Sequence, residues 1–304
     1  MYRKMLVLLD GSKLAEVVFT YAQELAGRLN IDLDLLHVCS PQEAEQLPMR
    51  KAYMEHKAED LRREAEQIRT ASAYKAEDKG IKAKGTVVVG YPADEILKYV
   101  DENNVDMIML STHGRSGMKA WNLGSVANKV IHGSRVPIWL VPAELREEII
   151  KDQIPRRTIV MPLDGSKLSA AVIPHAINIA KQRGAESQIV VLYVDDSNLP
   201  VFVEQWRQQE DKRLSISKYL DTIVKTINDA GISARSEVLK GVPSATIIDF
   251  VAKNSAQLIA MATHGHLGLS RMIFGSVTEN ILQLVKKTPI LLVGPYNAEK
   301  DISI

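Results

Sequence analysis

The sequence predicts two tandem α/β domains, each folded as a doubly wound, five-stranded parallel sheet. Short apolar runs bounded by turn residues alternate with longer segments of helical period, which is the pattern of parallel strands joined by crossover helices. The motif Thr-His-Gly, nine residues, Gly-Ser-Val also occurs twice, at 112–126 and 263–277. A repeat at an offset of about 150 residues indicates a duplicated domain.

Other matching segments follow in the same order in the two halves. Residues 3–14 align with 157–168, and both contain Leu-Asp-Gly-Ser-Lys-Leu. We therefore expect domains at 1–146 and 155–304, a size that suits one hydrophobic core each. The charged segment at 144–155 between them is expected to be a solvated connector with some helical character.

The elements of the first domain follow from its apolar pattern. Each short apolar run ends at a turn residue and predicts a strand, and each longer segment with apolar positions three and four residues apart predicts a helix. The strands are expected at 5–9, 33–38, 83–89, 107–110 and 138–141, and the helices at about 12–28, 50–79, 92–103 and 124–132.

The longest helix of each domain has one apolar stripe that would face the sheet. In the first domain the stripe is Met54, Ala58, Leu61, Ala65 and Ile68; in the second it is Ile216, Leu220, Ile223, Ile227 and Ala230. Gly80 and Gly231 are expected to end these helices, because glycine readily takes the left-handed conformation at the residue after the C-cap. An isoleucine follows each glycine and suits a contact back onto the helix.

Composition limits the classes of function. With 46% hydrophobic and 25% charged residues, the chain is expected to be a soluble globular protein. A net charge of +1 gives no basic excess for binding nucleic acid or an anionic membrane. Cys39 is the only cysteine, is expected to be buried, and excludes an intrachain disulfide. No apolar run is long enough for a signal peptide or a membrane span, so a cytoplasmic location is expected.

Ligands of doubly wound sheets bind at the carboxyl ends of the strands, where the strand order reverses. The sequence places three pairs of equivalent residues at such ends: Asp10 and Asp164 after the first strands, Val38 and Val194 in the second, and Leu110 and Met261 in the fourth. Asp-Gly-Ser after the first strand is equally well explained as a turn with an Asp or Ser N-cap.

Gly-Ser-Val at the start of a helix favours phosphate binding, because a helix N-terminus presents unpaired N–H groups and a partial positive charge. The alternative is that Gly-Ser is an ordinary N-cap. His113 and His264 lie in tight turns after strands and are not expected to be catalytic, since no nucleophile motif accompanies them. No metal-binding motif and no P-loop is present, so neither a metal site nor a catalytic residue is expected.

Taken together, these motifs resemble the universal stress protein family over nearly the whole chain. They are strand-Asp-Gly-Ser, a Gly-x-Pro start to the third helix, Ser/Ala-Thr-His-Gly, nine residues, Gly-Ser-Val, and a final x-Pro-Ile strand. In ATP-binding members the signature is Gly, two residues, Gly, nine residues, Gly, then Ser or Thr. The later glycines have counterparts here, but Ser111 and Ala262 replace the first one. This difference leaves ATP binding open.

The resemblance implies that adenine lies near Asp10 and Asp164 and near the backbone of Val38 and Val194. Single-domain members pair through their last strands, so 137–141 and 289–293 are expected to pair within this chain as an internal pseudo-dimer. The expected nucleotide-binding residues are Leu9, Asp10, Val38, Gly90, Leu110, Ser111, Gly114, Arg115, Gly124, Ser125 and Val126 in the first domain, and Leu163, Asp164, Val194, Gly241, Met261, Ala262, Gly265, His266, Gly275, Ser276 and Val277 in the second.

Two functions are compatible with the sequence. The first is a cytoplasmic stress protein that binds ATP or a related adenine nucleotide in one or both domains, with a regulatory or stress-resistance role and at most weak ATPase activity. If only one site binds, Pro162 before Leu163-Asp164 favours the second domain, because it is closer to the family's usual Pro-x-Asp. The alternative is a nucleotide-free regulatory or scaffolding module that acts through protein partners. With either function, the whole chain could also form a homodimer.

Overall fold

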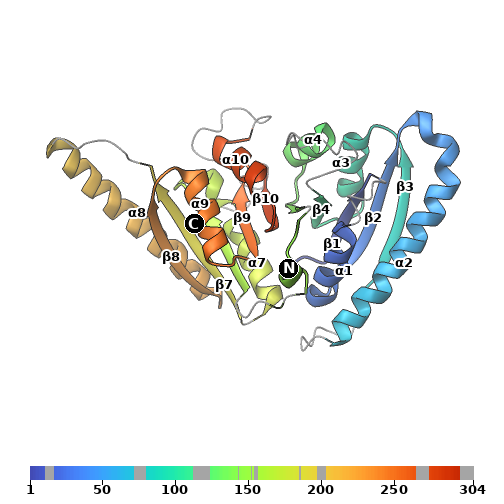
Figure 1. The fold of residues 1–304 in the computed structure, drawn as a ribbon, viewed down its shortest axis with the longest axis horizontal. Helices are drawn as coiled ribbons and strands as arrows, with labels where there is room; N and C mark the ends of the chain where they lie inside the picture. Colours follow the sequence, from blue (N-terminus) through green and yellow to red (C-terminus); the bar gives the residue numbers. More distant parts are fainter. Residues whose placement is uncertain are drawn as a thin grey trace.

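In the computed structural model, the two halves of the chain share one ten-stranded sheet (Figure 1). The described residues are 1–10, 17–71, 80–111, 124–142, 144–151, 153, 157–184, 186–196, 203–264 and 274–294. Across the sheet, the strands lie in the order β3-β2-β1-β4-β5-β10-β9-β6-β7-β8. Neighbouring strands are parallel except at the junction of the halves, where β5 and β10 are antiparallel.

The order β3-β2-β1-β4-β5 in the first half, with its counterpart in the second, confirms the predicted doubly wound fold. The elements of the first half are β1 (Lys4–Leu9), α1 (Val17–Leu29), β2 (Asp32–Cys39), the 3₁₀ turn η2 (Pro41–Gln46), α2 (Leu47–Ala71), β3 (Ala83–Val89), α3 (Pro92–Glu102), β4 (Met107–Ser111), α4 (Ser125–Gly133) and β5 (Ile138–Val141). The short helix α5 (Glu147–Ile150) lies in the connector.

The second half repeats the order of strands and crossover helices. Its elements are β6 (Arg157–Pro162), α6 (Lys167–Ala170), α7 (Ile173–Arg183), β7 (Ser187–Asp195), α8 (Val203–Asp229), β8 (Ser233–Lys240), α9 (Pro243–Lys253), β9 (Leu258–Ala262), α10 (Ser276–Leu284) and β10 (Ile290–Val293). Two helices, α6 and α7, stand where the repeat predicts one. Pro174 explains the break, because it lacks an N–H and is tolerated only in the first turn of a helix.

The start of α2 and the end of α8 lie close to the predicted residues. Helix α2 begins three residues before the predicted start, and the predicted end at 72–79 lies outside the described residues. Gly231 follows the end of α8 with φ +84°, and its N–H donates to the carbonyl of Asn228. The next N–H, of Ile232, donates to Ile227, so the helix ends in a Schellman motif.

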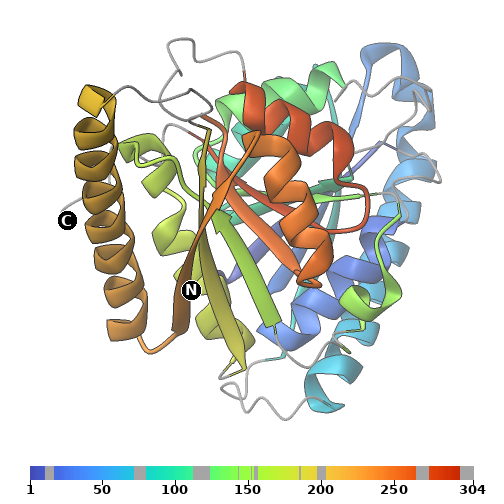
Figure 2. The same ribbon diagram turned by 60° about the vertical axis from the view of Figure 1, so that its left-hand side comes forward.

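Helices cover both faces of the sheet (Figure 2). Alternate residues of each strand point to opposite faces, so Met5 and Val7 enter one core and Leu6 enters the other. Helices α1, α2, α7 and α8 close the first core, and α3, α4, α9 and α10 close the second. Cys39 is fully buried in the first core, as predicted. Each core contains residues of both halves.

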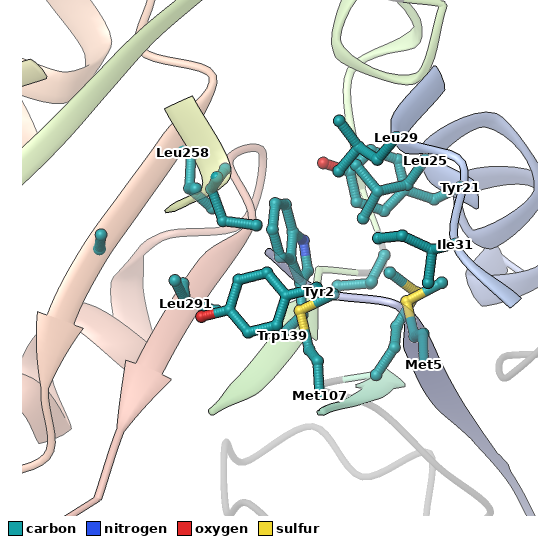
Figure 3. Close-up of a cluster of buried hydrophobic side chains, with 14 of the residues drawn as sticks. Tyr2, Met5, Tyr21, Leu25, Leu29, Ile31, Met107, Trp139, Leu258 and Leu291 are labelled. Atoms are coloured by element: carbon teal, nitrogen blue, oxygen red, sulfur yellow. The ribbon is translucent and has the colours of Figure 1, made fainter. Parts of the chain in front are cut away.

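The antiparallel pair β5 and β10 joins the halves and confirms the predicted internal pseudo-dimer. Trp139 on β5 pairs with Leu291 on β10, and both side chains are fully buried. Figure 3 shows the Trp139 ring among side chains of both halves, and its centroid lies 6.1 Å from that of Tyr21. This pairing covers two sheet edges that would otherwise be open to aggregation.

The connector is more than the solvated segment that its charges predict. Ile149 on α5 is fully buried in the first core, and Arg28 donates a hydrogen bond of 2.9 Å to the carbonyl of Ile150. Arg146 donates to the carbonyl of Ala256 in the second half at 3.0 Å. The buried side chain of Ile149 and these two hydrogen bonds therefore fix the connector to the rest of the protein.

Candidate functional site

Each half has one point where the strand order reverses. After β1 the chain passes to α1 on one face of the sheet, and after β4 it passes to α4 on the other face. The β1–β4 register pairs Val7 with Met109, so its continuation places Leu9 beside Ser111. In the second half, the register of β6 and β9 places Leu163 beside Ala262 in the same way. The predicted residues at the ends of these strands are thus brought together.

Helix α4 begins at the first of these points. Gly124 is its N-cap residue and Ser125 its first helical residue, and no side chain caps the helix. The alternative of an ordinary N-cap thus holds for Gly124, whereas Ser125 lies inside the helix and its hydroxyl does not cap it. Gly124, Ser125 and Val126 are all exposed, and the first turn of α4 contains no acidic residue. Unpaired N–H groups and the helix dipole favour an anion there.

Neither backbone conformation nor packing requires glycine at residue 124. Its φ and ψ are −53° and 152°, which any residue can adopt, and a Cβ added there would meet no atom of the described ranges within 4 Å. There is accordingly open space beside the α carbon of Gly124, and a larger side chain at this residue would fill it.

The equivalent helix α10 is anchored to the end of β9. The N–H of Gly275 donates to the carbonyl of Thr263 at 3.1 Å, and the Thr278 hydroxyl donates to the carbonyl of Ala262 at 3.2 Å. Thr278 was not singled out in the sequence, since only the fold shows that it faces β9. Ser276 is exposed and Val277 partly buried, and Glu279 lies in the first turn of this helix.

The Asp-Gly-Ser segment of the second domain forms a capped turn. The N–H of Ser166 donates to Asp164 Oδ1 at 2.9 Å, and Ser166 Oγ accepts from the N–H of Ser169 to cap α6. The turn interpretation is thus confirmed for this copy, and it fixes the Asp164 carboxylate at the carboxyl end of β6. Asp10 occupies the matching position after β1 and is partly buried.

The second strands carry different side chains near their ends. Val38 and Val194 are both partly buried. His37 Nδ1 bonds the carbonyl of Leu9 at 2.8 Å, and its Nε2 contacts the Arg50 guanidinium. A proton on Nδ1 would leave Nε2 free to accept from Arg50, so the hydrogen-bond pattern favours this neutral tautomer.

Tyr193 takes the place of His37 in the second domain. Burial, followed by the negative charges of Asp195, Asp196 and Asp164, raises the pKa of its phenol. This end of β7 is therefore more acidic than the corresponding end of β2.

Gly90 and Gly241 lie farther from the two switch points than the other predicted residues. They follow β3 and β8, which are separated from β1 and β6 by one strand each. Packing and backbone conformation explain both glycines. A Cβ at residue 90 would lie 2.6 Å from Cγ of Glu95, and Gly241 has a φ of +148°.

Several predicted site residues cannot be placed. His113, Gly114, Arg115, Gly265 and His266 lie outside the described residues. His264 is buried, and its Nδ1 lies 2.9 Å from Thr263 Oγ1, which is consistent with the structural role expected for it. Within the described ranges, no cluster of three or more His, Cys, Asp or Glu side chains is arranged to hold a metal ion. None of the described helices is both long and apolar enough to span a bilayer.

Comparison with known proteins gives the same family for both halves. The profile of the universal stress protein family matches residues 1–142 and 155–294. A universal stress protein of Methanocaldococcus jannaschii is 35% identical over 141 residues, which cover 45% of this chain and 81% of that protein. One from Mycobacterium tuberculosis is 25% identical over 290 residues, covering 93% of this chain and 94% of its own.

A solved structure has the same two-domain fold. The crystal structure of a universal stress protein from Archaeoglobus fulgidus superposes with a TM-score of 0.66 at 21% identity, and the match covers 96% of this chain and 98% of that one. At this identity the likeness concerns the fold alone.

Proposed function

Because the chain belongs to the universal stress protein family, we propose that it is a tandem stress protein that binds ATP or a related adenine nucleotide at one or both switch points. In this proposal, binding rather than turnover regulates a stress response. Adenine would lie near Asp10 or Asp164 and beside the second strand, and the phosphates would lie at the start of α4 or α10.

The observation that carries the proposal is the unexplained glycine at the start of α4. Among the described residues, a Cβ at Gly124 would meet no atom within 4 Å, and the backbone conformation suits any residue. A phosphate held by the first amides of the helix would need this space, and Ser125 could add its hydroxyl. The absence of acidic side chains from the first turn of α4 supports the same proposal.

The test is isothermal titration with ATP of the wild-type chain and of Gly124→Val and Gly275→Val. We expect ATP to bind, and at least one of these substitutions to remove a binding event while the circular dichroism spectrum stays unchanged. Lys98→Val, a change of an exposed residue on α3 outside the site, is the control for the effect of an added valine on folding. Absence of ATP binding at millimolar concentration would reject the proposal.

A nucleotide-free regulatory or scaffolding module is the second candidate. It is favoured by the bonds that Gly275 and Thr278 make to the end of β9, because they give the second copy of the motif a structural role. Ser111 and Ala262, in place of the first glycine of the signature, favour it as well. ATP binding that Gly124→Val abolishes, with the fold intact, would count against this candidate.

A further inference from the structure

A second group of polar side chains lies at the amino ends of β6 and β7. The switch points lie at the opposite, carboxyl ends of the strands. Arg157 begins β6, Ser187 begins β7, and the register pairs these two residues. Arg183 is the last residue of α7, and its carbonyl accepts a hydrogen bond from Nη1 of Arg157. The side chains of Arg157 and Ser187 and the last residue of α7 therefore belong to one region.

Two of these side chains are deeply buried and incompletely bonded. Arg183 is 7% exposed and Ser187 is 2% exposed. Neither Arg183 Nη1 nor Ser187 Oγ has a hydrogen-bond partner, and among the described residues no carboxylate forms an ion pair with Arg183. A buried cation without a counter-charge is costly, and an orphaned buried donor points to a missing water or ion.

The first domain shows that the fold does not need polar residues here. Asn30 and Gly184 both have positive φ just after α1 and α7, so Leu29 corresponds to Arg183. The strand registers align Ile31 with Ser187 in the same way. Leu29 and Ile31 are 3% and 0% exposed and belong to the apolar cluster of Figure 3.

We propose that Arg183, Ser187 and Arg157 form a binding site for a small tetrahedral oxyanion, of the phosphate or sulfate class, at the amino end of the second domain's sheet. The guanidinium of Arg183 would pair with two oxygens of the anion, which is the geometry that arginine favours, and Ser187 would donate its hydroxyl. Arg157 donates to the Arg183 carbonyl, and its charge offsets the negative end of the α7 dipole, which would otherwise repel an anion. This site is separate from the proposed nucleotide site and does not depend on it.

The test uses the thermal unfolding of the full chain in phosphate, in sulfate and in chloride at equal ionic strength. We expect phosphate or sulfate to raise the Tm of the wild-type protein by several degrees relative to chloride. The variant Arg183→Leu with Ser187→Ile carries the residues of the first domain. It should lose the response and keep a Tm in chloride at least equal to that of the wild type, because it buries no orphaned cation.

Ser187→Ala and Arg183→Lys are milder variants that keep the experiment informative if the double variant does not fold. Each should weaken the phosphate response, Arg183→Lys because lysine cannot make two parallel bonds. To separate this site from the starts of α4 and α10, the variant Gly124→Val with Gly275→Val is included and should retain the phosphate response. Equal phosphate responses in wild-type, Arg183→Lys and Ser187→Ala proteins, or no response in the wild type at tens of millimolar, would overturn the proposal.

Discussion

Tyr99 on α3 donates a hydrogen bond to the buried carboxylate of Asp34 on β2, with 3.1 Å between Oη and Oδ2. Lys4 lies 3.6 Å from the same carboxylate oxygen. Burial, and also the negative charge of Asp34, raises the pKa of Tyr99, so the phenol remains a donor at neutral pH. In the second domain, Phe250 and Val190 occupy the matching positions and are both buried.

Tyr99→Phe should therefore destabilise the protein by about 1–3 kcal/mol, because it leaves a buried carboxylate without its donor. Tyr99→Phe combined with Asp34→Val reproduces the pair of the second domain and should recover most of that loss. Urea unfolding of the single and double variants measures the coupling between the two residues. Equal stability of Tyr99→Phe and the wild type would show that the hydrogen bond contributes nothing.

His132 on α4 contacts the second domain. Its ring centroid lies 4.5 Å from that of Phe274 and 5.8 Å from that of His264. Burial, with a smaller contribution from His264, lowers the pKa of His132, and its Nδ1 bonds the Asn128 carbonyl at 3.0 Å. The unfolded chain thus binds more protons than the native state as the pH falls below the ordinary histidine pKa of about 6.5.

The free energy of unfolding should consequently decrease as the pH falls from about 6.5 toward the lowered pKa of His132 in the native state. Above pH 6.5 the imidazole is neutral in both states, so this destabilisation should be absent. His132→Gln introduces the residue found at the same place on α10, Gln283, and does not titrate. Urea unfolding at a series of pH values should show a steeper loss of stability in the wild type than in this variant. Parallel pH profiles would contradict the assignment to His132.

The sequence predicted the local elements well. Apolar runs, turn residues and the repeat determine strands such as β1 and helix ends such as Gly231, because these depend on neighbours in the chain. Pro174 could have revealed the break between α6 and α7, yet the strength of the repeat concealed it. Contacts between distant segments, such as His132 with Phe274, could not be predicted, since they depend on how the two halves of the sheet join.

The candidate site was likewise predictable from the sequence only in part. The pattern Gly-Ser-Val located the starts of α4 and α10. Only the structure shows that a side chain at Gly124 would meet empty space, whereas Gly90 has Glu95 against it. The sequence could not separate these two kinds of glycine, because both follow a strand and precede a helix.

The first turns of α4 and α10 differ in charge, and this difference should affect nucleotide affinity. Asn128 and Lys129 on α4 correspond to Glu279 and Asn280 on α10, and all four side chains are exposed. A carboxylate in the first turn repels a phosphate from the helix N-terminus. The charges therefore favour ATP at the first domain, in contrast to the preference that Pro162 indicates.

Asn128→Glu should weaken ATP binding at the first domain about two- to fivefold, and Glu279→Asn should strengthen it at the second by a similar factor. Isothermal titration in the backgrounds Gly275→Val and Gly124→Val isolates one site at a time. Lys98→Glu, a change of an exposed residue on α3 outside the site, controls for net charge. A wild-type affinity that falls only in Gly275→Val would identify the second site as the stronger one.

Gln182 on α7 joins the N-terminal segment to the second domain. Its side chain accepts from the Tyr2 N–H at 2.9 Å and donates to the Tyr2 carbonyl at 2.8 Å and the Leu29 carbonyl at 3.2 Å. Gln182→Ala would leave these buried backbone groups unpaired and should cost about 1–3 kcal/mol in urea unfolding. Gln188→Ala, which removes a partly buried bond to Thr158, should cost clearly less. If both substitutions lowered the free energy of unfolding by similar amounts, the bonds of Gln182 to Tyr2 and Leu29 would not be more important for stability than the partly buried bond that the control variant removes.

Gly85 and Gly124 allow a direct comparison of a glycine required by packing with one that is not. A Cβ on Gly85 of β3 would lie 2.3 Å from the Met54 carbonyl oxygen on α2, a backbone atom that cannot yield without moving the helix. Gly85→Ala should therefore lower the free energy of unfolding by about 1–3 kcal/mol. Gly124→Ala should leave it unchanged within about 0.5 kcal/mol.

The effects of these two substitutions on ATP affinity should have the reverse order. A methyl group at residue 124 would enter the space assigned to a phosphate, whereas Gly85 lies on an edge strand away from both switch points. Gly124→Ala should thus reduce ATP affinity and Gly85→Ala, where it folds, should not. Urea unfolding and titration with ATP on the same two preparations separate the effects. If Gly124→Ala destabilised the protein as much as Gly85→Ala, the glycine would have a structural role, and the main support for a phosphate at the start of α4 would be lost.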